Sequence, residues 1–169
     1  ARALLAGIVT DCELSNEAFP HLAWRSGIVA GVPVRLYRIS FTGELSYEVH
    51  CDARHAHAVW NAIWAAGAAF DACAYGTENM HVLRAEKGYL IIGQETDGTV
   101  GPDDLGLGWA IANKKPDFIG KRSLARADMQ RADRKQLVGL LPEQPIPEGA
   151  QLVAMPDDTA MLGYVTSSY

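Results

Sequence analysis

The chain has 169 residues, of which 49% are hydrophobic and 21% are charged, and its net charge is −5. This is the composition of a globular chain with its own core, and the acidic balance argues against a nucleic-acid partner, which would need a basic surface. Without a run of about 18 apolar residues, no membrane span is expected. Three widely spaced cysteines argue against a disulfide framework and favour a reducing, cytoplasmic location.

The first half of the chain is predicted to contain a β-hairpin. Residues 1 to about 25 are expected to form a helix and a loop. Alternating apolar residues predict a strand over 31–41, turn residues follow at 42–44, and a returning strand is expected over 47–51.

Two helices are predicted after this hairpin. Asp52 stands at an N-cap position, where its carboxylate can accept from free backbone N–H groups, and Gly67 is placed to end the helix. Thr77 is expected to cap a second helix that closes at Gly88. The apolar residues of the first helix recur at helical spacing: Val59, Trp60, Ile63 and Trp64.

The second half is predicted to be less regular. Residues 93–108 hold five glycines and a proline, so irregular backbone is expected there, and a helix is predicted over 117–129. A change of composition places a domain boundary near residue 133, which divides the chain into 1–133 and 134–169. Short β-type runs follow, separated by proline and glycine: 136–141, 150–154 and 161–166.

Several kinds of site are disfavoured by the spacing of the residues that they would need. His50, Cys51, His55 and His57 point in different directions from a strand and a helix, so no metal site is predicted. The glycine-rich stretch lacks the GxGxxG and GK[ST] patterns of phosphate-binding loops, and no GxSxG nucleophile elbow is present.

Five short motifs together resemble the aminomethyltransferase family, the glycine-cleavage T-proteins. Residues 41–49 resemble its GYTGEDGFEI motif, 83–88 its LRLEAG and 104–109 its EAGLGW. The segments 120–124 and 163–167 resemble its G-[KR]-x-x-L motif and the start of its C-terminal barrel. Order and spacing agree over nearly the whole chain, and RAEKG, GQETDG and GPDDLGLGWAI look most like the sarcosine oxidase alpha subunit and dimethylglycine dehydrogenase branch.

The resemblance implies an α+β fold and a function in one-carbon transfer. The fold would be the C-terminal half of a T-protein-like folate-binding domain followed by an incomplete small β-barrel. The function would be to bind tetrahydrofolate and transfer to it the one-carbon unit released on oxidative demethylation of sarcosine. Alternatives are a glycine-cleavage aminomethyltransferase, a dimethylglycine oxidase or dehydrogenase, and a non-catalytic folate-binding or assembly module.

Site residues follow from the same resemblance. Glu48 matches the pterin-binding glutamate, whose carboxylate can accept two parallel N–H bonds. Trp109 matches a tryptophan near the folate, where it would offer a flat apolar wall. Phe41 replaces a tyrosine and Met80 replaces an arginine of the T-protein, and the loss of that cation disfavours transfer from a lipoyl carrier.

The resemblance also gives expectations for two supporting residues, for the catalytic base and for the longer protein. Arg84 and Glu86 are expected to support the site, as a structural ion pair more than as ligand contacts. No catalytic residue is assigned, because the family's catalytic aspartate would lie before residue 1. We expect the chain to be a segment of a longer protein, inactive by itself, with NAD and flavin elsewhere in the full enzyme and other sarcosine oxidase subunits as partners.

Overall fold

The computed structural model describes residues 1–157 and 159–169, and it combines helices with antiparallel sheets. The chain divides into two compact units, Ala1–Tyr89 and Leu90–Tyr169. The mixed α and β character expected from the sequence is confirmed.

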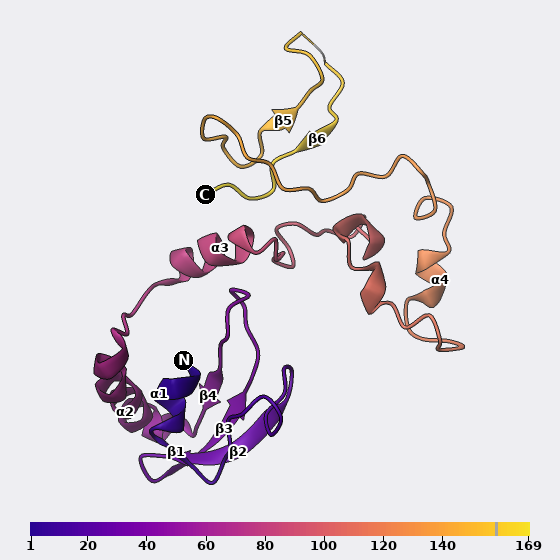
Figure 1. Ribbon diagram of the computed structural model, residues 1–169. Helices are drawn as coiled ribbons and strands as arrows, with labels where there is room; N and C mark the ends of the chain where they lie inside the picture. The colour runs from indigo at the N-terminus through magenta and orange to yellow at the C-terminus, as the bar shows by residue number, and fades with distance from the viewer. Residues whose placement is uncertain (158) are drawn as a thin grey trace. The chain divides into compact units, whose positions relative to one another are not determined.

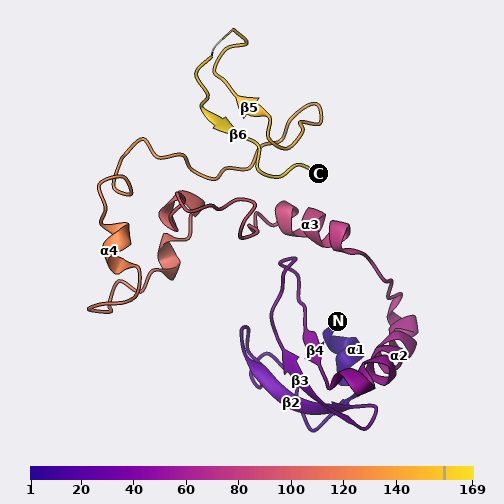
Figure 2. The same ribbon diagram turned by 180° about the vertical axis from the view of Figure 1, so that it is seen from behind.

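The first unit is built on a four-stranded antiparallel sheet with the order β1-β2-β3-β4. Its strands are β1 (Val9–Thr10), β2 (Trp24–Val29), β3 (Val32–Tyr37) and β4 (Glu48–His50). The helices α1 (Arg2–Ala6) and α2 (Ala56–Gly67) cover one face of this sheet (Figures 1 and 2), and α3 (Thr77–Glu86) follows α2 in the chain. The core contains Leu5, Val9, Leu14, Phe19, Val29, Val32, Val34, Leu36 and Val59.

The predicted hairpin is confirmed as the pair of strands β3 and β4. Burial along β3 alternates, with Val32, Val34 and Leu36 in the core and the residues between them facing away. This alternation is the pattern from which the strand was predicted, since successive side chains of a strand point to opposite faces.

The strand β2 was missed by the sequence prediction. Its first half is exposed and lacks an apolar alternation, and Gly27 in its interior is a residue that usually weakens a strand. The structure explains this glycine by the close approach of β1 and the loop that follows it. A Cβ at this position would lie 3.1 Å from Cγ1 of Val9 and 3.3 Å from Cβ of Cys12.

The ends of the two helices are partly as predicted. The Asp52 side chain accepts from the backbone N–H of Arg54 at 3.1 Å and caps the 3₁₀ turn that leads into α2, as expected. The prediction that Thr77 caps α3 is wrong, because Gly76 occupies the cap position and Thr77 is the first helical residue. Gly88 follows α3 with φ of +71°, the left-handed conformation expected after a helix end.

Gly67 ends α2 as predicted, but for a different physical reason. Its own φ is −62°, and the left-handed residue is Asp71, with φ of +50°. A Cβ on Gly67 would lie 2.8 Å from Cβ of Ala72, so the absence of a side chain lets the chain fold back closely after the helix.

Replacing Gly67 by Ala should destabilise the first unit by about 1–2 kcal/mol, because overpacking outweighs the better helix propensity of alanine. Hydrogen exchange of α2 amides in the intact protein would measure the change. Gly7→Ala is a matched control, since a Cβ there meets only ordinary contacts, at 3.4 Å from the Leu4 carbonyl oxygen. Equal effects of the two substitutions would contradict the packing explanation.

The second unit has little regular structure. It contains 3₁₀ turns at Asp103–Leu105 and Gly108–Ala110, the short helix α4 (Lys121–Leu124), and the two-stranded sheet of β5 (Gln151–Leu152) and β6 (Gly163–Tyr164). Residues 93–108 are mostly irregular, as predicted.

Two predictions for the second unit are wrong in extent. The helix expected over 117–129 is reduced to α4, because Gly120 is left-handed with φ of +95° and the following residues lack an apolar stripe. The strand expected over 136–141 does not form, and Leu140 and Leu141 are exposed. In the described part of this unit, two of the three expected β-runs pair and no closed barrel is present.

Candidate functional site

The face of the sheet that points away from the core carries aromatic and charged side chains. In the strand register, Trp24 pairs with Tyr37 and Tyr37 pairs with Glu48, which puts these three residues in one row across the sheet. Arg35 and His50 are paired in the next row. Because residues opposite one another in antiparallel strands share a face, all five lie on one surface, here called the sheet-face cluster.

Contacts within the sheet-face cluster link its members. His50 Nε2 lies 2.7 Å from Glu48 Oε2, and the two side chains are 57% and 54% exposed. The Tyr37 and His50 ring centroids are 4.9 Å apart, and the Arg35 guanidinium carbon lies 6.0 Å from the centroid of the Trp24 ring. The cluster therefore offers one hydrogen-bonded carboxylate beside flat rings, open to solvent.

The loop between β3 and β4 packs against the end of α3. Glu44 Oε1 lies 3.1 Å from Lys87 Nζ, and the rings of Phe41 and His81 are 6.2 Å apart. Gly43 has φ of +80°, and a Cβ there would lie 2.5 Å from Cγ of Lys87, so only glycine fits this turn. Two of the motifs noticed in the sequence, far apart along the chain, are therefore in contact.

The predicted residues on and near α3 differ in their surroundings. Met80 is half-buried and lies next to His81. Arg84 is 2% exposed and its Nη1 donates to the Tyr89 carbonyl at 3.0 Å, which holds the chain after the helix, whereas Glu86 is at the surface. Residues two apart on a helix do not face one another, so Arg84 and Glu86 point to different sides of α3.

Trp109 belongs to the second unit. It lies on the 3₁₀ turn at Gly108–Ala110 and is 82% exposed. Its ring is therefore open to solvent in this unit, as are several other large apolar side chains of the chain.

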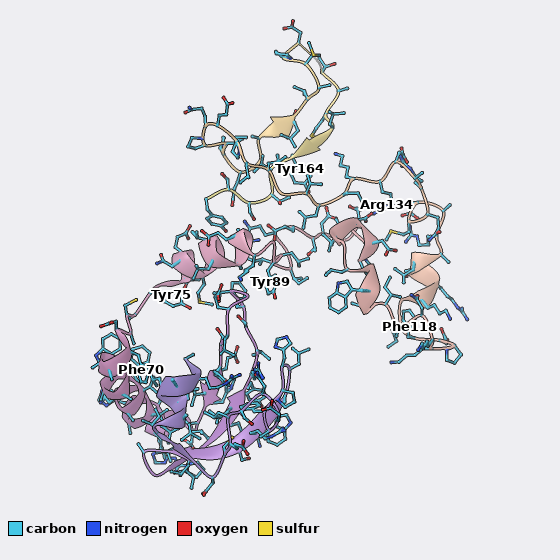
Figure 3. All side chains as sticks on the ribbon, in the orientation of Figure 1. Phe70, Tyr75, Tyr89, Phe118, Arg134 and Tyr164 are labelled. Atoms are coloured by element: carbon cyan, nitrogen blue, oxygen red, sulfur yellow. The ribbon has the colours of Figure 1, made fainter. Side chains whose placement is uncertain are left out.

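An ion pair between the buried Asp104 and the partly buried Arg134 links segments of the second unit, and the sequence prediction missed it. Arg134 donates to both carboxylate oxygens of Asp104, at 2.8 and 2.5 Å, and also to the Thr99 carbonyl at 2.6 Å. Asp104 further accepts from the N–H of Gly101 at 2.7 Å, and its carbonyl accepts from the N–H of Leu137 at 2.8 Å. Figure 3 labels Arg134 on the segment that follows α4.

These contacts set the protonation of the pair. Hydrogen bonds from Arg134 hold the pKa of the Asp104 carboxyl below its usual range, against the opposing effect of burial. The same contact raises the pKa of Arg134. The pair is therefore ionised at neutral pH and acts as a structural link between the glycine-rich stretch and the segment after α4.

Potential metal ligands and cysteines are the remaining side chains that could carry chemistry. No group of three His, Cys, Asp or Glu side chains among the described residues is arranged to hold a metal ion. Cys12, Cys51 and Cys73 are free thiols, and burial raises the pKa of the Cys12 thiol against the lowering effect of Arg25. No helix in the described ranges has the length and apolar character needed to cross a membrane.

Comparison with known proteins identifies the family. Residues 1–115 match the family model described as the GCVT N-terminal domain. The chain belongs to the GCVT family. The match includes the hairpin that carries Glu48, the helix α3 and Trp109.

Several known proteins are similar to this chain over all or most of its length. Sarcosine oxidase subunit alpha of Corynebacterium sp. (strain P-1) is 46% identical over 178 residues, and that of strain U-96 is 44% identical, each covering 100% of this chain. The aminomethyltransferase of Halothermothrix orenii is 33% identical over 142 residues, covering 84% of this chain and 39% of the relative. The chain spans 18% of the length of the two sarcosine oxidase relatives. The predicted resemblance is confirmed.

Proposed function

We propose that this GCVT-family chain is the tetrahydrofolate-binding region of an enzyme of the sarcosine oxidase type. Its role would be to deliver to tetrahydrofolate the one-carbon unit released on oxidative demethylation of sarcosine. The observation that carries the proposal is the 46% identity over the whole chain with a protein named sarcosine oxidase subunit alpha.

The chemistry of the sheet-face cluster fits a pterin. The Glu48 carboxylate can accept the two parallel N–H bonds that the amino-pyrimidinone edge of a pterin donates. Trp24 and Tyr37 share its row and offer flat faces for a conjugated ring. Glu48 is 54% exposed, so its carboxylate is open to such a ligand. When bound, tetrahydrofolate supplies the amine nucleophile, and the chain's residues bind and orient it.

The family resemblance adds further expected folate contacts. Phe41 and Met80 would contribute apolar contacts where T-proteins have tyrosine and arginine. Trp109, which belongs to the second unit, is assigned a folate contact by the resemblance alone. The arginine missing at Met80 favours this reading over an aminomethyltransferase, although a relative of that name is 33% identical to this chain. The proton acceptor is expected from a part of the intact protein outside this chain.

The larger arrangement is part of the same proposal. Residues 1–133 would belong to the folate-binding domain, and 134–169 would begin a small β-barrel domain. NAD and flavin would bind elsewhere in the intact enzyme, whose other subunits would oxidise the amine substrate.

Isothermal titration of the intact protein with tetrahydrofolate tests the proposal. We expect saturable binding, because Glu48 and its row match the edge and the faces of a pterin. Methotrexate, which presents a different pteridine edge, provides a comparison for the hydrogen-bonding pattern. An absence of binding heat up to millimolar tetrahydrofolate would reject the proposal in favour of a structural or assembly module.

A further inference from the structure

We propose that His50 is a positioning residue, which fixes the Glu48 carboxylate for ligand binding by donating from Nε2 to Oε2. This inference rests on the proposed function of Glu48. Residues two apart in a strand share a face, and here the two side chains meet at 2.7 Å. With Oε2 held by His50, Oε1 and the remaining acceptor positions of the carboxylate are available to the ligand.

Positioning matters because a glutamate side chain is long and rotates freely when exposed. Holding it in one rotamer before the ligand arrives removes part of the entropy that binding would otherwise cost. Hydrogen bonds that involve a carboxylate are among the stronger ones, and either form of histidine with a proton on Nε2 can donate here.

The residues around His50 orient its ring and do not compete with Glu48 for its hydrogen bond. The Tyr37 ring lies against it, with centroids 4.9 Å apart and planes tilted by 58°. Arg35, its partner across the strands, is drawn to the ring of Trp24 at 6.0 Å. Asp52, two residues further along the chain, pairs with Arg54 at 2.7 Å. The neighbouring charges are therefore engaged elsewhere.

A contribution to folding is a poor explanation of this pair. Both side chains are more than half exposed, and exposed ion pairs add little to stability because solvent screens them. The contact instead joins Glu48, the carboxylate of the sheet-face cluster, to the His50 ring, which packs against Tyr37.

Three substitutions in the intact protein test the inference, with tetrahydrofolate affinity measured by isothermal titration. His50→Leu removes the donor and should weaken tetrahydrofolate binding roughly 5- to 10-fold. This is at the lower end of the affinity losses seen when a residue that supports a ligand-binding side chain is removed. His50→Gln keeps an N–H donor at similar reach and should restore affinity to within about 2-fold of the unchanged protein. His57→Leu is the matched control, because His57 is exposed and contacts Asn61 on α2.

A second comparison asks whether His50 acts through Glu48. His50→Leu should have little further effect when Glu48 is already replaced by Gln, since coupled residues give non-additive changes. An undiminished effect in that background would overturn the inference by making His50 a direct ligand contact. Unchanged affinity in His50→Leu while Glu48→Gln weakens binding would also overturn the inference, because His50 would then have no role in binding, and it would leave the proposed function intact. Failure of the unsubstituted protein to bind tetrahydrofolate would reject both.

Discussion

Replacing Asp104 by Asn should lower the free energy of unfolding of the second unit by about 2–3 kcal/mol. This is the largest effect on folding that we expect from a single polar substitution in this chain. Asp104 is 6% exposed, and the substitution removes the charge that faces Arg134 while leaving the guanidinium largely enclosed. Hydrogen exchange at the amides of Gly101 and Leu137, which both bond to Asp104, measures the loss. Their protection should fall roughly 30- to 150-fold.

Asp103→Asn is the control for this substitution. Asp103 is the immediate neighbour of Asp104 but is exposed. Replacing Asp103 should therefore change the free energy of unfolding by less than about 0.5 kcal/mol. Arg134→Lys should show an intermediate loss, because an ammonium group cannot reproduce the two parallel bonds of the guanidinium. Equal protection in Asp104→Asn and Asp103→Asn would contradict the central role of the pair.

The pair also predicts how the stability of the second unit depends on pH. The pKa of Asp104 is lowered in the folded chain, chiefly by hydrogen bonds from Arg134, so its stabilisation is fully present above the unfolded pKa of about 4. It is lost as pH falls below that value through the lowered folded pKa. Protection factors, corrected for intrinsic exchange, should therefore fall in acid for the unsubstituted protein, and Asp104→Asn should show a smaller acid-dependent change.

The elements that sequence patterns predicted are those whose signals are local. Alternation along β3 and the Asp52 cap before α2 depend on neighbouring residues, and both were confirmed. The helix expected over 117–129 failed because propensity without an apolar face does not sustain a helix, and only four residues of it form. The pairing of Asp104 with Arg134 spans 30 residues and leaves no local pattern.

The candidate site illustrates the same limit. Glu48 was predicted from a motif within a few residues of it, and His50 shares its face because it lies two residues along the same strand, whereas Tyr37 and Trp24 join them only through strand register. The place of Trp24 depends on β2, which the sequence prediction missed because Gly27 and the exposed half of the strand lack a strand pattern. The aromatic part of the sheet-face cluster therefore required the structure.

Replacing Glu48 by Gln in the intact protein should weaken tetrahydrofolate binding by about 1.5–3 kcal/mol, or roughly 10- to 150-fold. The amide keeps the shape of the side chain but replaces one acceptor oxygen with an N–H₂ donor, which would face a donor of the pterin edge. Folding should change by less than about 1 kcal/mol, because the side chain lies on the open face of the sheet. Isothermal titration and thermal unfolding measure the two effects separately.

The control for Glu48→Gln is Glu44→Gln, which makes the same chemical change in the same hairpin. Glu44 contacts Lys87 at the end of α3 and is not a member of the sheet-face cluster, so its replacement should leave folate affinity nearly unchanged. A selective loss at position 48 would tie the carboxylate to ligand recognition, because both substitutions remove one negative charge from the same loop and strand. If both variants bind tetrahydrofolate as tightly as the unsubstituted protein, Glu48 is a surface acid and the pterin must be held elsewhere.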